Sequence, residues 1–418
     1  MEKMVIAMTT DNNYIIPTKV AIYSMWKSTP AIYFEIHILC NDKLDNKNRE
    51  KLVQLADRLN RMSIVFDEVK DKVLDGANTL GHIPVASYYR LFICRFFDSD
   101  RCLFIDGDML INANLSDLYN INMEGYYIAG VRDCAVQSKN TAFANHEIEL
   151  GIPDMHQYVN AGFMLFNLKK IREDNLDNLF VDAISNGYRY MDQDIINKFC
   201  YGKIKHLPLR YNLFGEFYGR LEKLNGTDFS KEEIEGAVNW AVLHYPGGYK
   251  PWICSRLKAN QIWWTVAIEA LSKKEYATCC KLVKEYERVS DWSYIYDKVN
   301  GYTNVVIFGY SQIGCELENR LRKTMLKISI VFADNDPNKQ GLIHEGNEVL
   351  SAKEAVRECA LSCWLISSQV AHSSIKQQLL ELGIKEEQIV RYIYKTDAYY
   401  EGLDEENYKY EMKILENN

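Results

Sequence analysis

Short apolar runs alternate with longer amphipathic segments over the first hundred residues of the chain. Residues 4–8, 34–39 and 62–66 are runs of aliphatic and aromatic side chains, which are typical of buried strands. Between them, residues 18–27 and 44–61 carry apolar side chains at helical spacing. This alternation predicts an α/β fold with a mostly parallel sheet that helices cover on both faces.

The stretch "RCLFIDGDMLIN" at 101–112 follows a further predicted helix at 84–97. Its apolar run is expected to form a strand, and the run ends in two aspartates, Asp106 and Asp108. Parallel sheets bind ligands beyond the carboxyl ends of their strands. We therefore expect both carboxylates at a ligand-binding edge, with a positive charge between them because two buried like charges repel.

The pattern changes after the first 254 residues. Residues 255–300 have helical spacing with interleaved aromatic and lysine side chains, and residues 301–395 resume the alternation of strands and helices. We predict a first α/β domain over 1–254, a helical linker over 255–300 and a second, small Rossmann-like α/β domain over 301–395. The acidic segment 396–418 has no clear pattern and is left unassigned.

The second predicted domain contains an incomplete dinucleotide motif. Gly309 and Gly314 lie between a strand and a helix, but Ser311 occupies the middle glycine position of G-x-G-x-x-G. Asp334 follows the next strand about twenty residues later, as a ribose-binding acid would. Two interpretations stay open: a nucleotide site, or a Rossmann-like module that serves docking or homo-oligomerisation.

Composition narrows the class of protein. No apolar run is long enough to span a membrane, and the N-terminal apolar stretch is interpreted as a strand and not as a signal peptide. Eleven scattered cysteines without metal-like spacing favour a reducing compartment, most simply the cytoplasm. The net charge of −8 argues against a nucleic-acid partner.

The Asp106–Gly107–Asp108 turn has three interpretations when taken alone. It suits a divalent cation, because two carboxylates offer hard oxygen ligands and leave positions open for phosphate. It is also typical of exposed turns and helix caps. A magnesium-dependent phosphohydrolase would use Asp106 as its nucleophile, although Met109 and Leu110 stand where such enzymes usually have Gly-Thr.

Five further polar stretches appear in order around this turn: "MTTDNNY" (8–14), "SYYRLF" (87–92), "YVNAGFMLFNLKK" (158–170), "YMDQDIINKF" (190–199) and "LHYPGGYKPW" (243–252). With the aspartate pair they make the first 260 residues resemble the retaining family-eight glycosyltransferases, bacterial galactosyl- and glucosyltransferases related to glycogenin. The resemblance implies a GT-A type, Rossmann-like nucleotide-sugar domain.

The resemblance also implies a site. Asp106, Asp108 and His244 match metal ligands, an oxygen and nitrogen set that suits Mn²⁺ or Mg²⁺. Gln193 and Asp192 match residues at the reacting centre of the donor sugar. The positions that match donor-binding residues are Thr9, Thr10, Asp11, Asn13, Arg90, Asp106, Gly107, Asp108, Asp133, Asn160, Gly247 and Lys250.

Each match has a purely structural alternative. His244 has the alternative of a hydrogen-bonded core histidine, Arg90 that of an ordinary ion-pair partner, and Asn160 that of a cap. Asp192 has the alternative of a helix N-terminal charge, and Asp194 is assigned to that role outright. Four aromatic residues are interpreted as packing residues: Tyr14, Trp252, Trp263 and Trp264.

The expected function is transfer of glucose or galactose from a UDP-sugar, with retention, to a saccharide, lipid-linked or protein acceptor, most simply in lipopolysaccharide or capsule synthesis. Either departing UDP takes the acceptor proton on the same face, or Gln193 or Asp192 acts as a nucleophile. The phosphohydrolase and a degenerate sugar-binding protein stay as alternatives. Residues 255–300 are expected either to touch a membrane surface or to pack beneath the second domain.

Overall fold

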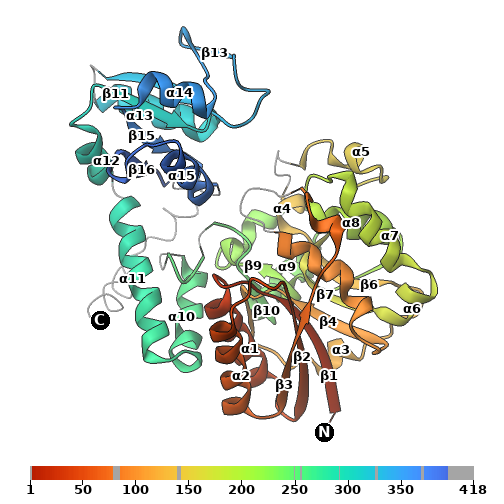
Figure 1. The fold of residues 1–418 in the computed structure, drawn as a ribbon. Coiled ribbons are helices and arrows are strands. Elements are labelled where there is room, and N and C mark those ends of the chain that lie inside the picture. The colour runs from red at the N-terminus through yellow and green to blue at the C-terminus, as the bar shows by residue number, and fades with distance from the viewer. Residues whose placement is uncertain are drawn as a thin grey trace. The chain divides into compact units, whose positions relative to one another are not determined.

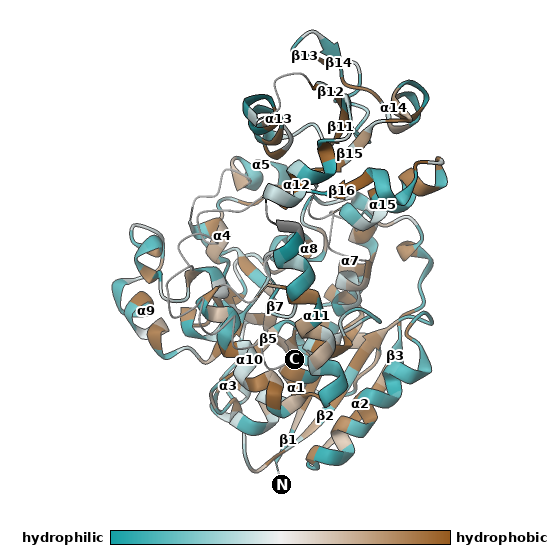
Figure 2. Cartoon of the chain, turned by 90° about the vertical axis from the view of Figure 1, so that its left-hand side faces the viewer, coloured by the Kyte–Doolittle hydropathy of each residue, from teal (hydrophilic) through white to brown (hydrophobic). Residues whose placement is uncertain are grey.

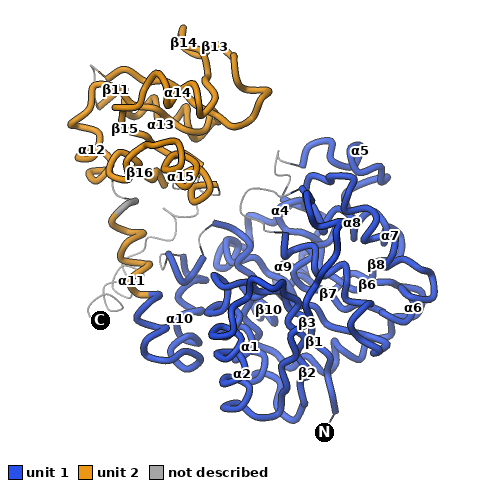
Figure 3. The backbone as a smooth tube through the Cα atoms, viewed as in Figure 1, with its two compact units in different colours: residues 1–279, 405–413, 418 blue, residues 280–404, 414–417 orange. Residues whose placement is uncertain are grey.

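The structure is a computed structural model that describes residues 2–78, 85–138, 143–248, 250–254, 257–290, 292–324, 328–368 and 371–393. The first residue of the helix predicted at 84–97 and the whole 396–418 segment lie outside these ranges. The chain divides into two compact units between Cys279 and Cys280, within helix α11 (Lys273–Ser290) (Figure 3). This division falls inside the predicted helical linker.

The first unit is built on a seven-stranded sheet with the order β3-β2-β1-β4-β7-β6-β8 (Figure 1). The strands are β1 (Glu2–Thr9), β2 (Ile32–Cys40), β3 (Met62–Glu68), β4 (Arg101–Ile105), β6 (Ile128–Arg132), β7 (Val159–Asn167) and β8 (Ile204–His206). Strands β1 to β4 pair in parallel, whereas β7 runs antiparallel to β4 and to β6. The predicted α/β fold with a mostly parallel sheet is confirmed.

Amphipathic helices cover the sheet. Helix α2 (Asn46–Leu59) buries Leu52, Leu55 and Leu59, and most of its other residues are hydrophilic (Figure 2). Helix α1 (Ile15–Ser28) is more deeply buried than α2. The remaining helices of this unit are α3 (Ser116–Tyr119), α4 (Cys134–Gln137), α5 (His146–Leu150), α6 (Leu168–Glu173), α7 (Leu176–Asp182), α8 (Met191–Cys200), α9 (Lys231–Gly236) and α10 (Lys258–Ala270).

The predicted helix at 84–97 is a 3-10 helix, η2 (Val85–Arg95), and not an α-helix. Seven successive residues, 87–93, are buried, so this segment has no solvent-facing stripe of the kind that amphipathic α-helices show. It packs against β1, β2, α7 and α8. Tertiary packing, which a local pattern does not record, therefore decides its geometry.

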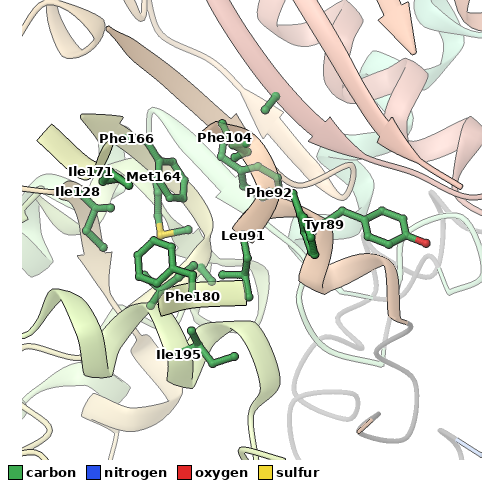
Figure 4. Close-up of a cluster of buried hydrophobic side chains, with 14 of the residues drawn as sticks. Tyr89, Leu91, Phe92, Phe104, Ile128, Met164, Phe166, Ile171, Phe180 and Ile195 are labelled. Carbon is green, nitrogen blue, oxygen red and sulfur yellow. The ribbon is translucent and has the colours of Figure 1, made fainter. Parts of the chain in front are cut away.

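The core beneath the site combines η2, β4, β7 and α8 (Figure 4). The labelled side chains are Tyr89, Leu91, Phe92, Phe104, Ile128, Met164, Phe166, Ile171, Phe180 and Ile195. Close packing of this kind fixes the backbone of the elements that contribute to it. Arg90 and Asp192, which come from η2 and α8, are consequently held on rigid supports.

A second, three-stranded sheet brings distant parts of the first unit together. Strand β10 (Val242–His244) pairs with β5 (Met109–Ile111) on one side and with β9 (Leu213–Phe214) on the other. The antiparallel register places His244 opposite Met109. His244 thereby becomes a spatial neighbour of Asp108.

The second unit is a small α/β domain with a four-stranded parallel sheet of order β12-β11-β15-β16. Its strands are β11 (Asn304–Phe308), β12 (Ser329–Ala333), β15 (Cys363–Ile366) and β16 (Ile389–Arg391), with a hairpin of β13 (Ile343–His344) and β14 (Asn347–Glu348). Its helices are α12 (Trp292–Val299), α13 (Gln312–Thr324), α14 (Ala352–Cys359) and α15 (His372–Glu381). Successive residues of β11 face separate apolar clusters, as expected for a sheet covered on both sides.

None of the helices in the described ranges is both long enough and apolar enough to cross a bilayer.

Candidate functional site

A cavity of about 210 Å³ opens beyond the carboxyl ends of β1 and β4. The predicted site residues that line it are Thr9, Thr10, Asp11, Arg90, Asp106, Gly107, Asp108, Asn160, Asp192, Gln193, His244 and Lys250. Three predicted residues do not line it: Asn13, Asp133 and Gly247. The structure thus brings twelve positions from six sequence stretches into one cavity.

The cavity has further lining residues that the sequence analysis did not single out for the site: Tyr14, Ala86, Ser87, Ala161, Gly162, Tyr190 and Pro246. Three of them, Tyr14, Ala161 and Pro246, each adjoin a predicted residue along the chain. Gly162 is the one with a clear structural reason to be there. A Cβ on this glycine would lie 2.6 Å from Cε1 of His244 and 2.7 Å from Oδ2 of Asp106, so any other residue would fill the space between them.

The two aspartates each use one oxygen for a protein cation. Oδ1 of Asp106 accepts from Nη2 of Arg90 at 3.1 Å, and Oδ2 of Asp108 accepts from Nζ of Lys250 at 2.6 Å. Their other oxygens lie 4.0 and 3.4 Å from Nε2 of His244. The ligand atoms of the three residues lie within 4.8 Å of one another, so two oxygens and one nitrogen converge on one point.

A chain of hydrogen bonds defines which nitrogen of His244 carries its proton. The backbone N–H of Gly162 donates to Oδ1 of Asn160 at 3.0 Å, which identifies that atom as the oxygen. Nδ2 of Asn212 donates to the same oxygen at 3.0 Å, so Oδ1 of Asn212 faces Nδ1 of His244 at 2.9 Å and accepts from it. In neutral His244 the lone pair of Nε2 therefore points toward the two aspartates.

This arrangement fits a divalent cation. A nitrogen lone pair and two carboxylate oxygens repel one another unless a positive charge lies between them. The O/O/N donor set suits manganese or a similar ion, and Asn212 supplies the outer hydrogen bond that orients a ligating imidazole. Gly107 allows the turn between the two aspartates to approach α1 closely, because a Cβ at Gly107 would lie 2.6 Å from Oγ1 of Thr18 on that helix.

The acids of the site differ in their electrostatic surroundings. Burial raises the pKa of Asp106, and Arg90 offsets only part of that effect. Burial also acts on Asp108, but the charge of Lys250, together with that of His244 when it is protonated, outweighs burial and holds the pKa of the Asp108 carboxyl well below its usual range. Burial raises the pKa of Asp192 to about 6, against the opposing charge of Arg90. Asp108 is thus the most firmly ionised of the three.

Gln193 is held by a network on the inner wall of the cavity. Its Oε1 accepts from the backbone N–H of Ala161 at 3.0 Å and from Nδ2 of Asn160 at 3.1 Å. Its Nε2 donates to Oδ2 of Asp133 at 3.2 Å. Asp133 in turn caps α4 through its other oxygen, which accepts from the backbone N–H of Ala135. Asp133 therefore lies behind the cavity wall and orients Gln193 and Asn160.

Asp192 and Gln193 directly follow Met191, whose backbone conformation is rare for a residue other than glycine. Met191 has φ +55°, in the left-handed region, and is fully buried. Asp194 fixes this turn, since its oxygens accept from Tyr158 Oη at 2.6 Å and from the backbone N–H of Tyr190 at 2.7 Å. Asp194 lies in the first turn of α8, as predicted for a helix N-terminal charge, and is also a fully buried hydrogen-bond acceptor.

The loop with Lys250 carries aromatic neighbours. Nζ of Lys250 lies 5.9 Å from the ring centroid of Tyr14 and 6.0 Å from that of Trp252. Burial raises the pKa of Tyr14 to about 12, so this phenol is neutral. Trp252, Trp263 and Trp264 are buried, as predicted for packing residues. Tyr14 packs edge-on against Trp252 and also lines the cavity.

A sequence profile described as Glycosyl transferase family 8 matches residues 5–254, which is more than half of the chain. The chain belongs to glycosyl transferase family 8. The matched segment contains every residue of the cavity. A second profile, described as C2185-like, N-terminal, matches residues 301–390.

Two lipopolysaccharide glycosyltransferases are similar to this chain over more than half of its length. Lipopolysaccharide 1,2-glucosyltransferase of Escherichia coli is 29% identical over 252 residues, covering 58% of this chain and 71% of that protein. Lipopolysaccharide 1,3-galactosyltransferase of Salmonella typhimurium is 22% identical over 266 residues, covering 60% and 73%. The solved galactosyltransferase LgtC superposes with a TM-score of 0.56 at 22% identity, covering 66% of this chain and all of that one, and confirms the fold.

Family membership decides between the interpretations of the aspartate pair. The chain is a glycosyltransferase, so the phosphohydrolase with Asp106 as a nucleophile is set aside. The roles predicted for the donor-site residues stay predictions. The positions of these residues in the cavity allow each role to be tested.

Proposed function

We propose that this family 8 enzyme transfers a hexose, glucose or galactose, from UDP to an acceptor hydroxyl with retention at the anomeric carbon. The single observation that carries the proposal is the convergence of Asp106 Oδ2, Asp108 Oδ1 and His244 Nε2 at the mouth of a cavity. Manganese suits this donor set, with magnesium as the alternative. When bound, the cation neutralises charge on the diphosphate of the leaving group.

The protein's own residues have separable roles in this proposal. Asp11, Thr9 and Thr10, at the carboxyl end of β1, bind the nucleoside, because all three line the cavity. Lys250 donates to the diphosphate, since its ammonium already lies in the cavity on Asp108. Arg90 holds Asp106 and Asp192 in place through Nη2 and Nε, at 3.1 and 2.9 Å. Lys250 and the cation together stabilise the negative charge that develops on departing UDP.

Retention is proposed to follow the same-face route. The bond between the anomeric carbon and the diphosphate oxygen breaks, the acceptor oxygen bonds to that carbon on the same face, and the acceptor proton passes to departing UDP. Gln193 is a poor nucleophile, because a carboxamide is weakly nucleophilic and its oxygen already accepts two hydrogen bonds. Asp192 is committed to an ion pair with Arg90. Both residues then bind and orient the sugar.

The acceptor is proposed to be a saccharide hydroxyl, in the synthesis of a cell-surface polysaccharide. The support is the similarity to enzymes that are named for glucose and galactose transfer to lipopolysaccharide. The cytoplasmic location, the membrane contact and the homo-oligomer inferred from the sequence stay predictions. The prediction of a cytoplasmic location rests on the cysteine pattern, and all eleven cysteines are free thiols in the structure.

The test uses purified protein, manganese and a panel of UDP-sugars. We expect slow hydrolysis of UDP-glucose or UDP-galactose that stops in chelator, and an α-configured first product in the proton NMR spectrum. A β-configured product from the α-linked donor would overturn retention. Full turnover in chelator would overturn the metal role. Binding of UDP-sugars without any turnover, with or without acceptor, would support the degenerate sugar-binding alternative.

A further inference from the structure

Helix α10 lies beyond the segment that matches the family profile, yet it contacts the loop that carries Lys250. The loop runs from Tyr245 to Cys254, and Tyr249 is its one residue outside the described ranges. Figure 1 shows α10 beside α1, and the two helices pack against each other. Within α10, six residues are fully buried: Ala259, Asn260, Trp263, Trp264, Ala267 and Ala270.

Three hydrogen bonds join this helix to the loop. Tyr245 Oη donates to the backbone oxygen of Ala259 at 2.6 Å. Nδ2 of Asn260 donates to the backbone oxygen of Cys254 at 2.6 Å. Nε1 of Trp264 donates to the backbone oxygen of Pro251, the residue after Lys250, at 3.0 Å. Both ends of the loop and its centre are therefore tied to one helix.

The loop in turn positions the ammonium of Lys250. Nζ donates to Oδ2 of Asp108 at 2.6 Å and to the backbone oxygen of Tyr245 at 2.5 Å. The backbone oxygen of Lys250 accepts from the N–H groups of Ile253 and Cys254, which closes a tight turn. A displacement of Pro251 would move this turn, and with it the point from which the lysine side chain extends.

We propose that α10 is a positioning element of the donor site, and that Trp264, through its hydrogen bond to Pro251, sets where Lys250 meets the diphosphate. The inference rests on the proposed function, because it takes the diphosphate as the partner of Lys250. Trp264 does not line the cavity of the donor site and is therefore a positioning residue. A small misplacement of a charged donor is enough to weaken its contact with a ligand.

The chain offers a matched control in the neighbouring tryptophan. Trp263 is as deeply buried as Trp264, but within the described part of the chain its Nε1 has no hydrogen-bond partner. Trp264→Phe and Trp263→Phe remove the same atoms from the same helix. The Trp263 ring also packs against Trp252 of the loop, with 5.7 Å between ring centroids, but only Trp264→Phe removes a hydrogen bond to the loop. A larger effect of Trp264→Phe than of Trp263→Phe therefore reports that hydrogen bond.

The readout is the affinity of the full-length protein for UDP and for uridine, each with manganese, by calorimetry. We expect Trp264→Phe to weaken UDP binding about three- to tenfold, the range of one net hydrogen bond, with uridine affinity unchanged. Trp263→Phe should leave the ratio of the two affinities at its wild-type value. In a Lys250→Ala background, Trp264→Phe should have no further effect on UDP, because the group that it positions is gone.

Equal losses for UDP and uridine, or equal effects of the two tryptophan variants, would show a merely structural helix and overturn the inference. If Trp264→Phe does not fold, Tyr245→Phe repeats the test, because it removes only the hydroxyl that joins the loop to the backbone oxygen of Ala259 on α10. Failure of the proposed function is separate, since it would appear as absent UDP binding in the wild-type protein. A loss of UDP affinity that persists in the Lys250→Ala background would also contradict the inference.

Discussion

The two units of this protein contain the same kind of sequence signal, a glycine and an aspartate directly after a buried parallel strand. In the first unit the signal is Gly107 with Asp106 and Asp108 after β4, and in the second it is Gly309 after β11 with Asp334 after β12. In the first, carboxylate oxygens face a cavity and converge with an imidazole. In the second, the polar groups are directed back into the fold itself.

The second unit uses its aspartate for internal hydrogen bonds. Oδ2 of Asp334 accepts from the backbone N–H of Tyr310 at 2.8 Å, and Oδ1 accepts from that of Asp336 at 2.9 Å. Gly309 has φ +117°, which favours glycine, and a Cβ on Gly314 would lie 2.2 Å from the backbone oxygen of Gly309. These glycines allow close approach between strand and helix of the same domain.

The comparison shows that a motif acquires its chemistry from where its hydrogen bonds go. An acid whose acceptors are filled by neighbouring backbone amides stabilises a turn. An acid that keeps one oxygen directed at a cavity, opposite a nitrogen lone pair, is prepared for a cation. Both interpretations of the second domain, a nucleotide site and a module for docking, stay predictions.

The largest expected difference between the two aspartates is in turnover. Asp108→Asn should lower donor hydrolysis by about a thousandfold or more, because it removes a charged ligand from a cation that contributes several kcal/mol to the transition state. Asp334→Asn should leave hydrolysis unchanged. Steady-state rates with the active UDP-sugar measure both. Similar losses in the two variants would remove the distinction drawn above.

A second prediction concerns the residue that orients His244. Asn212→Leu should weaken manganese binding about ten- to a hundredfold, the usual effect of losing the partner of a ligating imidazole. The reason is that Nδ1 of His244 loses its acceptor, so the orientation of Nε2 is no longer fixed. Electron paramagnetic resonance of free manganese in titrations measures the change. Unaltered affinity would show that strand pairing alone holds His244.

Removal of the second unit gives a smaller expected effect. A chain that ends near residue 300 keeps every cavity residue and α10, so its UDP affinity should stay within about twofold of the full-length value. A chain that ends at residue 254, where the family match ends, should lose UDP affinity because the Lys250 loop has no support. Circular dichroism checks folding before calorimetry. A folded longer fragment without UDP affinity would place part of the donor site in the second unit.

The smallest expected effect is on the stability of the second unit. Asp334→Asn should lower its free energy of unfolding by about 1 kcal/mol, since a charged acceptor of two backbone amides becomes a neutral one. Urea unfolding followed by fluorescence measures the shift. If the variant keeps its stability but loses UDP affinity, Asp334 binds a ligand, and the contrast drawn between the aspartates of the two units is wrong.

The sequence alone predicted a large share of the site because the informative residues cluster at the ends of periodic segments. The strand before Asp106, the turn with Asp11 and the start of the strand with Asn160 are local features, and the order of six such stretches indicated the family. Nothing local pointed to Asn212 or to Tyr158, which support His244 and the turn before Gln193. Their roles depend on contacts between segments far apart in the chain, which a single sequence does not record.

What the sequence determined by itself is the set of elements and the residues at their ends, because periodicity and turn chemistry act over a few neighbouring residues. The tertiary structure decided which of those ends share a cavity. It paired β10 with β5, so that His244 faces the aspartates, and it placed Lys250 on Asp108 across 142 positions of the chain. It also turned the acid of the second unit inward. Most buried polar groups form hydrogen bonds, and only the folded chain determines which partner is in reach.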